Sequence, residues 1–404
     1  MAGKQPVEVV VVGAGIIGLA VAWRARERGM EVTVLERERT GRATSFVAAG
    51  MLAPVAEVEF GEAGRRVLEL GLRSSQLWPA FAAELERTAG VEVGLMRTGT
   101  LLLARDEDGA RELERQLAFR GSLGLRVSRL RPSEARAREP ALAPTLRLAL
   151  EAPDDHSVDP RLVLAALRRA CESAGVKVRE HAEVARIERD AGGVTGVTLA
   201  GGEQVSATRV VLAAGPWSDR IEGLPAEARV PVRPVKGQIL RLRDPGGPGL
   251  LGMVVRFEGG YVVPRAEGRY VLGATVEERG FAPRATVGGV YELLRDAGEL
   301  LPGLRELEIE ELSVGFRPGT PDNAPAIGPG AVDGLIWATG HHRNGILLAP
   351  LTAEMVVAAI EGAGTTELEH RSIAELLATC APGRFAPGAQ EAVAQGGAPV
   401  GALL

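Results

Sequence analysis

Two arginines lie in short segments whose backbone is constrained by glycine and proline. Arg317 lies in GFRPG at residues 315–319, and Arg343 lies in GHHRNG at residues 340–345. The planar guanidinium donates two parallel hydrogen bonds, which suits recognition of a carboxylate. Both arginines are therefore candidates for binding an acidic group of a small ligand. The alternative is that both form ion pairs at the protein surface.

His341 and His342 precede Arg343 and raise the question of a metal site. Adjacent histidines in a turn are poorly placed to share one ion, and no cluster of Cys, Asp or Glu accompanies them. We therefore expect no metal, and a structural or cofactor-contact role for this pair.

Three glycines near the N-terminus, Gly13, Gly15 and Gly18, have the spacing GxGxxG. The spacing alone is weak, since GPGLLG at 247–252 also matches but contains a proline and follows no β-branched segment. The first match follows VEVVVV (7–12) and opens IIGLAVAWRARERG (16–29), whose apolar positions have helical spacing. A second strand, EVTVL, then ends at Glu36. This order is typical of a dinucleotide-binding unit.

Each position of such a unit has a physical role. Gly13 permits the tight turn, Gly15 lets the pyrophosphate approach the backbone, and Gly18 allows close packing of helix and strand. The helix N-terminus faces the phosphates, and Glu36 can accept hydrogen bonds from both ribose hydroxyls. A later strand ending in glycine, ATRVVLAAGPWSD (207–219), supplies a second close approach, and we find no second dinucleotide unit. The sequence therefore favours FAD over NAD, the alternative being a plain α/β crossover.

Composition sets the broad class of the protein. The 404 residues are 46% apolar and 25% charged, as expected for a globular protein with a substantial core. The net charge of -5 indicates no nucleic-acid partner. Two distant cysteines, Cys171 and Cys380, fit a reducing cytoplasm. The apolar segment 7–23 contains Glu8 and the spaced glycines, so we expect neither a signal peptide nor a membrane span.

Five segments together resemble the glycine oxidase and D-amino-acid oxidase family of FAD-dependent oxidoreductases. They are ATSFVAAGMLAP (43–54), PVKGQ (234–238), YVVPR (261–265), GFRPGTPDNAPAIG (315–328) and GHHRNGILLAP (340–350). The last is the strongest match, and it is more similar to bacterial glycine oxidases of the thiamine pathway than to their relatives. The resemblance extends to about residue 375.

The resemblance implies non-covalent FAD, because neither cysteine lies near GFRPG, where related sarcosine oxidases attach the flavin. It also implies that backbone N–H groups of residues 344–346, with the positive end of a helix, face the N1–O2 edge of the flavin. The cofactor residues that we expect are Gly13, Gly15, Ile17, Gly18, Glu36, Arg37, Thr44, Ser45, Ala49, Gly50, Met51, Val184, Ala214, Gly215, Trp217, Arg317, His342, Arg343, Asn344, Gly345 and Ile346.

For the substrate, the resemblance implies that Arg317 holds a carboxylate with the help of the Tyr261 hydroxyl. Arg343 is expected nearby, where it orients the substrate or the flavin. Gly259 stands where some glycine oxidases have histidine, and Val276 stands where some have methionine. We therefore expect Gly259, Val276 and Met51 in the substrate pocket.

The implied activity is oxidation of glycine, and of sarcosine and small D-amino acids, by hydride transfer from the α-carbon to flavin N5. The imine is hydrolysed to glyoxylate and ammonia or supplies thiazole synthesis for thiamine, and oxygen is reduced to hydrogen peroxide. A cytoplasmic homo-oligomer, a tetramer or dimer without a membrane partner, is expected. The alternatives are a D-amino-acid or sarcosine oxidase, a dehydrogenase that reduces a quinone, and a non-enzymatic dinucleotide-binding protein.

These residues require an α/β fold with a Rossmann-like FAD-binding domain and a smaller α+β substrate domain that contains a mixed or antiparallel sheet. We expect the FAD-binding domain to comprise 1–90, 147–220 and 312–380, and the substrate domain 91–146 and 221–311. The Pro- and Gly-rich segment 381–404 is expected to be a flexible tail. Near the C-terminal motif we expect a strand at 335–338, a close approach at Gly340, and a helix that begins within the turn and continues through 350–360.

Overall fold

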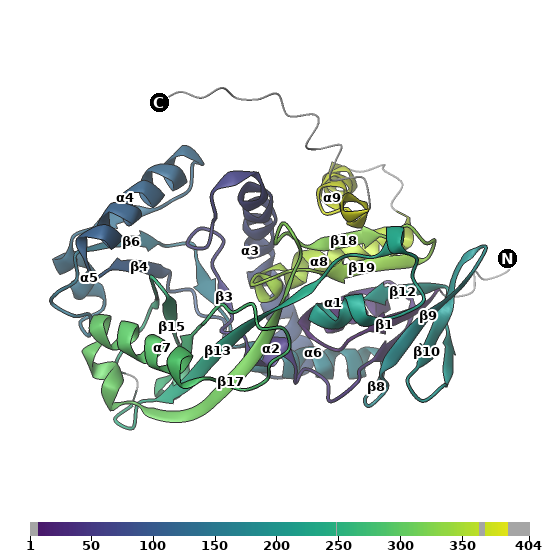
Figure 1. The fold of residues 1–404 in the computed structure, drawn as a ribbon, viewed down its shortest axis with the longest axis horizontal. Helices are drawn as coiled ribbons and strands as arrows, with labels where there is room; N and C mark the ends of the chain where they lie inside the picture. The colour runs from purple at the N-terminus through teal and green to yellow at the C-terminus, as the bar shows by residue number, and fades with distance from the viewer. Residues whose placement is uncertain (1–6, 248, 363–367, 387–404) are drawn as a thin grey trace.

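The computed structural model describes residues 7–247, 249–362 and 368–386, and it has two lobes built on separate sheets (Figure 1). A six-stranded sheet with the order β18-β19-β12-β1-β2-β8 forms the core of the first lobe. Its strands are β18 (Ala326–Pro329), β19 (Leu335–Thr339), β12 (Arg209–Leu212), β1 (Glu8–Val12), β2 (Glu31–Leu35) and β8 (Lys177–Arg179). All neighbours pair in parallel except β18 and β19. The expected α/β fold with a dinucleotide-binding sheet is confirmed.

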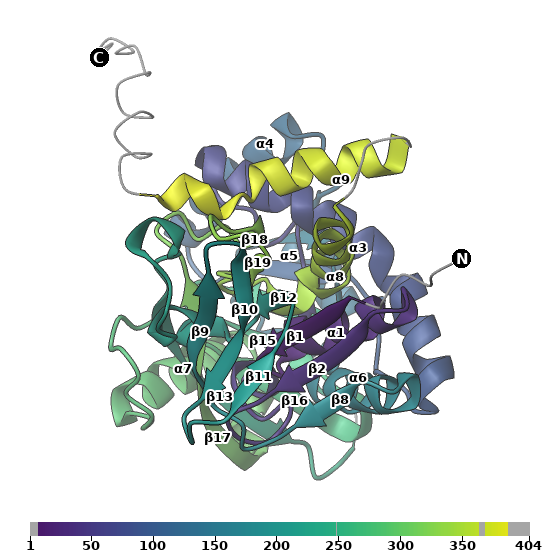
Figure 2. The same cartoon turned by 90° about the vertical axis from the view of Figure 1, so that its right-hand side faces the viewer.

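The central strand β1 is buried on both faces, which explains its unbroken run of valines. Val9 and Val11 face a layer of helices, whereas Val10 and Val12 face a small antiparallel sheet. The helices are α1 (Ile16–Glu27), α3 (Gly61–Ala89), α6 (Pro160–Ala174) and α8 (Gly345–Glu361). The small sheet is β9 (Val184–Asp190), β10 (Gly193–Leu199) and β11 (Gln204–Ser206), which Figure 2 shows beside the six-stranded sheet. α9 (Leu368–Thr379) runs past β18.

The second lobe contains an eight-stranded sheet with the order β17-β13-β16-β15-β14-β4-β6-β5. Its strands are β17 (Glu308–Gly319), β13 (Arg233–Arg243), β16 (Arg269–Gly273), β15 (Gly260–Pro264), β14 (Val254–Phe257), β4 (Thr100–Ala104), β6 (Leu148–Ala152) and β5 (Ser128–Leu130). The sheet is mixed, because β14 and β4 are parallel and the other pairs are antiparallel. Its helices are α4 (Glu107–Ser122), α5 (Pro132–Arg138) and α7 (Val287–Leu300).

The remaining elements are short. They are α2 (Thr44–Val47), the paired strands β3 (Met51–Leu52) and β7 (His156–Ser157), and the 3-10 turns η1 (Gly215–Arg220), η2 (Ala226–Ala228), η3 (Ala266–Gly268), η4 (Pro302–Glu306) and η5 (Pro382–Phe385). Among the residues described, no helix is both long enough and apolar enough to cross a membrane.

Strand pairing moves two of the expected domain boundaries. Strand β6 begins just after the boundary at 147, but it pairs with β4 and β5 and therefore belongs to the substrate sheet. Strand β17 crosses the boundary at 312 and pairs with β13 along its whole length. Both strands are apolar in part and continue a sheet whose other members lie far away in sequence, so local composition could not assign them.

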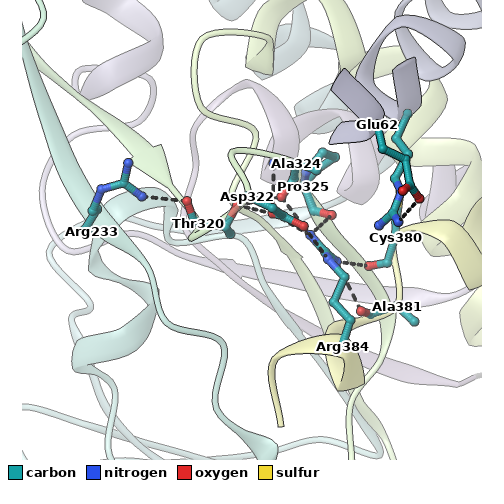
Figure 3. Close-up of polar contacts among 10 residues, drawn as sticks. Glu62, Arg233, Thr320, Asp322, Ala324, Pro325, Cys380, Ala381 and Arg384 are labelled. Atoms are coloured by element: carbon teal, nitrogen blue, oxygen red, sulfur yellow. Dashed lines mark hydrogen bonds and ion pairs between the residues drawn. The ribbon is translucent and has the colours of Figure 1, made fainter. Parts of the chain in front are cut away.

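The expected tail at 381–404 is wrong at its beginning, while 387–404 lie outside the described residues. Pro382 is buried in η5, and Arg384 fastens this turn to the loop at 320–325 (Figure 3). Its guanidinium pairs with Asp322 at 3.0 Å. It also donates to the carbonyl groups of Ala324, Pro325, Cys380 and Ala381. One arginine thus satisfies several loop carbonyls, which a Pro- and Gly-rich composition does not reveal.

Candidate functional site

A cavity of about 1510 Å³ is lined by residues of both lobes. Gly13 and Ala213 contribute from the ends of β1 and β12 in the six-stranded sheet, which they directly follow, and Gly237, Tyr261 and Arg317 contribute from the eight-stranded sheet. Pockets for one small ligand usually have roughly 300–1,000 Å³. The cavity therefore has room for a dinucleotide and a small second ligand.

The first glycine turn brings β1, α1 and β12 into close contact. Gly13 has φ +104°, and a Cβ there would lie 2.7 Å from the carbonyl oxygen of Ala213. A Cβ on Gly18 would lie 1.9 Å from the carbonyl oxygen of Gly13. These two glycines are required by the chain itself. Gly18 does not line the cavity and acts by allowing α1 to pack on β1.

Gly15 differs because no protein atom requires it. Its φ of -75° suits any residue, and a Cβ there would meet only the Ser45 hydroxyl, at 3.4 Å. Gly15 lines the cavity at the N-terminus of α1, where the Ile16 N–H donates to the Ser45 hydroxyl at 3.2 Å. A Cβ would fill the space that a phosphate needs at a helix N-terminus. The residues present therefore fit the pyrophosphate of FAD.

Glu36 follows β2 and is 8% exposed at the cavity wall. One carboxylate oxygen accepts from the Ala14 N–H at 2.8 Å and the other from the Glu38 N–H at 3.0 Å. Each oxygen keeps a further acceptor direction for a ribose hydroxyl. Arg37 lies over the Trp217 ring at 3.9 Å, and Trp217 stacks on Phe281 with 5.3 Å between ring centroids. This stack joins the two lobes at the cavity.

The C-terminal turn also approaches the cavity closely. Gly340 has φ +77°, and a Cβ there would lie 2.5 Å from the Thr320 side chain. The His342 N–H donates to the Pro318 carbonyl at 2.9 Å, and α8 begins at Gly345. Gly345 and Ile346 line the cavity with the positive end of α8. These contacts place a helix terminus, as expected, inside the turn.

Asn344 does not have the expected position. Its N–H donates to the His341 carbonyl at 2.8 Å, and the residue is absent from the cavity wall. This bond closes the turn that precedes α8, so the donors left to face the cavity are those of Gly345 and Ile346.

The two histidines are neutral at physiological pH for a common reason. His341 is 2% exposed and its ring lies 3.0 Å from the Thr352 hydroxyl, and burial lowers its pKa to about 3. Burial, together with the positive charges of Arg343 and Arg317, lowers the pKa of His342 to about 3. Within 7–247, 249–362 and 368–386, no group of three His, Cys, Asp or Glu side chains is arranged to hold a metal ion.

Arg317, on β17, has a cavity-facing guanidinium without a carboxylate partner among the residues that the structure describes. One nitrogen, Nη1, donates to the Thr275 carbonyl at 3.0 Å. Gly237 makes room for the group, since a Cβ there would lie 2.7 Å from Nη1. Burial raises the pKa of the Tyr261 phenol, and the adjacent Arg317 charge acts in the opposite direction. A cation and a neutral hydroxyl thus lie side by side in the cavity wall.

Arg343 also lines the cavity, but acidic groups engage its guanidinium. Nη1 lies 2.8 Å from the Glu59 carboxylate, Nε lies 3.4 Å from the Glu57 carboxylate, and Nη2 donates to the Glu57 carbonyl at 2.7 Å. That Arg343 orients the substrate or the flavin stays a prediction, since its guanidinium is engaged by Glu57 and Glu59. Arg343 fastens the segment before α3 to the turn before α8.

Asp155 and Arg256 hold the same segment through hydrogen bonds to its backbone. The Asp155 carboxylate, 0% exposed, accepts from the N–H groups of Val55 at 3.0 Å and Ala56 at 2.6 Å. Arg256 donates to the Ala56 carbonyl at 2.6 Å. Burial raises the pKa of Asp155 to about 7. The acidic partners of Arg343 therefore belong to a fixed part of the wall.

The three residues expected in the substrate pocket line the cavity at different depths. Met51 lies in β3, beside the loop that follows α2. Gly259 has φ +87°, and a Cβ there would lie 3.3 Å from the Asp296 carboxylate. Val276 is 72% exposed, so it lies at the rim and not in the interior as expected.

The structure brings nearly all the expected cofactor residues into this one cavity. Those that line it are Gly13, Gly15, Ile17, Glu36, Arg37, Thr44, Ser45, Ala49, Gly50, Met51, Val184, Ala214, Gly215, Trp217, Arg317, His342, Arg343, Gly345 and Ile346. Gly18 and Asn344 do not line it.

Sequence reasoning missed Gly237, Glu57 and Phe281. Gly237 had a usable signal, because a glycine inside an apolar strand marks a close approach. Glu57 and Phe281 lie in loops without periodicity, and only the three-dimensional packing brings Glu57 to the cavity and Phe281 onto Trp217.

Known proteins resemble this chain over most of its length. A family profile described as FAD dependent oxidoreductase, DAO, matches residues 8–359. A glycine oxidase from Geobacillus kaustophilus is 37% identical over 88% of this chain and 93% of its own length. The bifunctional protein ThiO/ThiG of Synechocystis sp. is 38% identical over 86% of this chain. The matched region covers 51% of the length of that protein.

The fold is similar as well. The crystal structure of glycine oxidase from Geobacillus kaustophilus superposes with a TM-score of 0.83 at 35% identity, covering 90% of this chain and 96% of that one. The resemblance expected from the five motifs is confirmed. With its glycine turns, helix terminus and arginine in one cavity, the chain belongs to the DAO family of FAD-dependent oxidoreductases.

Proposed function

We propose that this protein oxidises glycine with FAD and oxygen. The observation that carries the proposal is the Arg317 guanidinium, which faces the cavity without a carboxylate partner beside the Tyr261 hydroxyl. A fork of N–H donors next to a hydroxyl suits an α-carboxylate. A site for a cationic ligand would instead present unpaired acidic side chains. Here the Glu57 and Glu59 carboxylates are paired with Arg343.

Arg317 and Tyr261 hold the substrate carboxylate and thereby fix the direction of the α-carbon. When bound, FAD accepts a hydride equivalent from that carbon. Gly345 and Ile346 place the positive end of α8 at the cavity, where it stabilises the negative charge that this transfer creates. His342 has a pKa of about 3 and is a poor proton acceptor at neutral pH. The proposal uses no side-chain base, so the ammonium group of the substrate gives its proton to water and the neutral amine then reacts.

The balanced reaction converts glycine, oxygen and water into glyoxylate, ammonia and hydrogen peroxide. The electron pair leaves the C–H bond of glycine and finally reduces oxygen, while water adds to the imine carbon and releases ammonia. The names of the glycine oxidases and of the ThiO/ThiG proteins support this reaction. Supply of the imine to thiazole synthesis for thiamine is part of the proposal, since the chain spans about half the ThiO/ThiG proteins.

Sarcosine and small D-amino acids are second candidates on one observation. Gly259 lines the cavity two residues before Tyr261 and contributes no side chain to the wall, so we infer room there for a methyl group of the substrate. Rates with glycine, sarcosine, D-alanine and D-proline will rank these substrates. A cytoplasmic homo-oligomer remains a prediction that sedimentation and fractionation can check.

The first test is spectroscopic. The purified protein should be yellow, and glycine added without oxygen should bleach the visible flavin bands. Retained colour with all four amines would contradict amine oxidation, whereas bleaching followed by slow reaction with oxygen would identify a dehydrogenase.

The second test changes Arg317→Ala. Losing the carboxylate partner should raise the KM for glycine roughly 10²- to 10³-fold, as expected when one partner of a buried charge pair is removed. FAD content should stay near that of the parent. Arg243→Ala is the matched control, because Arg243 lies on neighbouring β13 with a 55% exposed side chain. An unchanged KM in Arg317→Ala would remove this residue from the carboxylate site.

A further inference from the structure

The motif YVVPR contains an arginine that the proposed reaction leaves without a role. Tyr261 and Val263 lie on one face of β15, since alternate residues of a strand share a face, and Arg265 continues this period. Tyr261 lines the cavity, Val263 packs with Ala49, and Arg265 donates through Nη2 to the Ala49 carbonyl. One strand therefore contacts both the substrate side of the cavity and the loop 48–51 beside it.

Arg265 is held behind this loop and not in the cavity. Its side chain is 6% exposed, and Nη1 donates to the Pro264 carbonyl at 3.0 Å. The Asp159 carboxylate lies 3.7 Å from Nε and partly neutralises it. Burial lowers the pKa of Arg265 to about 10, so the guanidinium remains charged at neutral pH.

The Ala49 carbonyl fixes the direction of the next N–H group. In a trans peptide the carbonyl of one residue and the N–H of the next point in opposite directions. Because the Ala49 carbonyl points to Arg265, the Gly50 N–H points away from Arg265, and Gly50 lines the cavity. Among the residues described, no acceptor is found for this N–H. An unpaired buried donor is costly unless a ligand accepts its hydrogen bond.

The other side of Gly50 is fixed independently. Its carbonyl accepts from the Val158 N–H at 2.9 Å. Gly50 has φ +73°, and a Cβ would lie 2.1 Å from the Val158 carbonyl oxygen, so only glycine fits. Two anchors, Arg265 and Val158, therefore leave this N–H little freedom to turn.

We propose that Arg265 is a positioning residue that turns the Ala49–Gly50 peptide so that the Gly50 N–H donates to the ring system of FAD. A donor held at the ring stabilises negative charge there and favours reduction of the cofactor. The inference rests on FAD in the cavity and not on glycine as the substrate. A failed glycine assay would therefore leave it intact.

A purely electrostatic role is the competing explanation. Arg161 and Arg241 bind the preceding helix α2, donating to the Phe46 carbonyl at 3.2 and 3.0 Å. Arg241 is 9% exposed and has the same charge as Arg265, but it contacts a different peptide. Arg241→Gln therefore reports what loss of a nearby positive charge does without releasing the Ala49 carbonyl.

The experiment measures the affinity of the oxidised holoenzyme for sulfite, which adds its sulfur electron pair to the flavin ring and needs no substrate or oxygen. The variants are Arg265→Gln, Arg265→Lys and Arg241→Gln. The control is Arg269→Gln, an exposed arginine on the adjacent strand β16. The two-electron reduction potential and the kinetic constants for glycine are measured on the same samples.

Arg265→Gln should weaken sulfite binding about tenfold, which corresponds to a potential lower by roughly 30 mV. Arg265→Lys keeps the charge but loses the fork, and should show an intermediate decrease. The kcat for glycine should fall while KM changes little, because Arg317 is untouched. Arg269→Gln should match the parent, and Arg241→Gln should change less than Arg265→Gln.

Two results would overturn the proposal. Folded, FAD-loaded Arg265→Gln with the sulfite affinity of the parent would show that the peptide does not depend on Arg265. An equal decrease in Arg241→Gln would assign the effect to charge. Should Arg265→Gln fail to fold, Arg265→Lys is compared with Arg269→Gln instead. Equal sulfite affinities of these two variants would reject the positioning role of Arg265.

Discussion

Both walls of the cavity carry charged side chains, but the wall formed by the six-stranded sheet depends on glycines that lack a Cβ, whereas the wall formed by the eight-stranded sheet depends on Arg317 and Tyr261. On the first side Gly13 and Gly15 line the cavity without a Cβ, and Gly18, which does not line it, lets α1 pack on β1. On the second side Arg317 and Tyr261 act through their functional groups. A backbone site depends on one local turn, while a side-chain site depends on how distant strands pair. The two walls should therefore fail in different ways when they are altered.

The largest effect is expected on the backbone side, from Gly18→Ala. A Cβ at 1.9 Å from the Gly13 carbonyl oxygen must push α1 away from β1. We expect unfolding to become easier by several kcal/mol and the purified protein to lack FAD. Denaturant titration and flavin absorbance measure both losses.

Gly29→Ala is the control for Gly18→Ala, because Gly29 has φ +81° but open space around its Cβ position. Only backbone strain of about 1 kcal/mol is expected there. Similar losses in both variants would show that close packing of α1 on β1 is not what makes Gly18 necessary.

Gly15→Ala sharpens the comparison, since here the ligand and not the chain needs the missing Cβ. Stability without FAD should change by less than about 0.5 kcal/mol, because the new Cβ meets only the Ser45 hydroxyl. FAD affinity should fall roughly 100-fold through a clash with the phosphates. Fluorescence titration with FAD measures it, and an undiminished affinity would move the pyrophosphate elsewhere.

The buried His341, in the turn before α8, should make the stability of the protein depend on pH. The pKa of His341 is lowered to about 3 in the folded protein, below its ordinary value of 6.5, so the unfolded chain binds more protons between these values. His341 therefore contributes stability above pH 6.5 that is lost as the pH falls towards 3. The loss is about 1.4 kcal/mol per pH unit, or roughly 2 kcal/mol between pH 6.5 and 5.

The measurement compares unfolding free energies of the parent and His341→Gln over this pH range. The variant has no titrating ring at this position, so its curve should be shallower by the stated slope. Parallel curves would mean that His341 is protonated or exposed in the folded protein.

The smallest effect is expected for Arg343→Gln. Because Glu57 and Glu59 occupy the guanidinium, the KM for glycine should rise less than about tenfold, while stability falls by about 1 kcal/mol. Steady-state kinetics and thermal unfolding test this contrast with Arg317→Ala. Equal KM changes in both variants would erase the distinction between the free and the paired arginine.

The backbone wall was predictable because its signals are local. The strand at 31–35, the glycine turn and the helix beginning inside GHHRNG all follow from residues adjacent in the chain. For the side-chain wall, the sequence predicted which residues take part but not which groups they contact. Arg343 is engaged by Glu57 and Glu59, which lie more than 280 residues earlier in the chain. Its hydrogen bond to the Glu57 carbonyl, for example, joins residues 286 positions apart.

The same limit explains the errors in the boundaries. Strands β6 and β17 carry no mark of the sheet that they join, because pairing partners are chosen by the fold and not by the strand alone. The bond from Asn344 to His341 is a matter of one turn's geometry, which residue types do not determine.

The contacts between Arg384 and the loop at 320–325 have a practical consequence for anyone who shortens or extends this protein. A chain that stops at Ala381 would retain every strand of both sheets, yet the loop that carries Asn323 to the cavity would lose its outer brace. Affinity tags and fused partners are therefore best attached after residue 386, so that Arg384 keeps its contacts with Asp322 and Ala324.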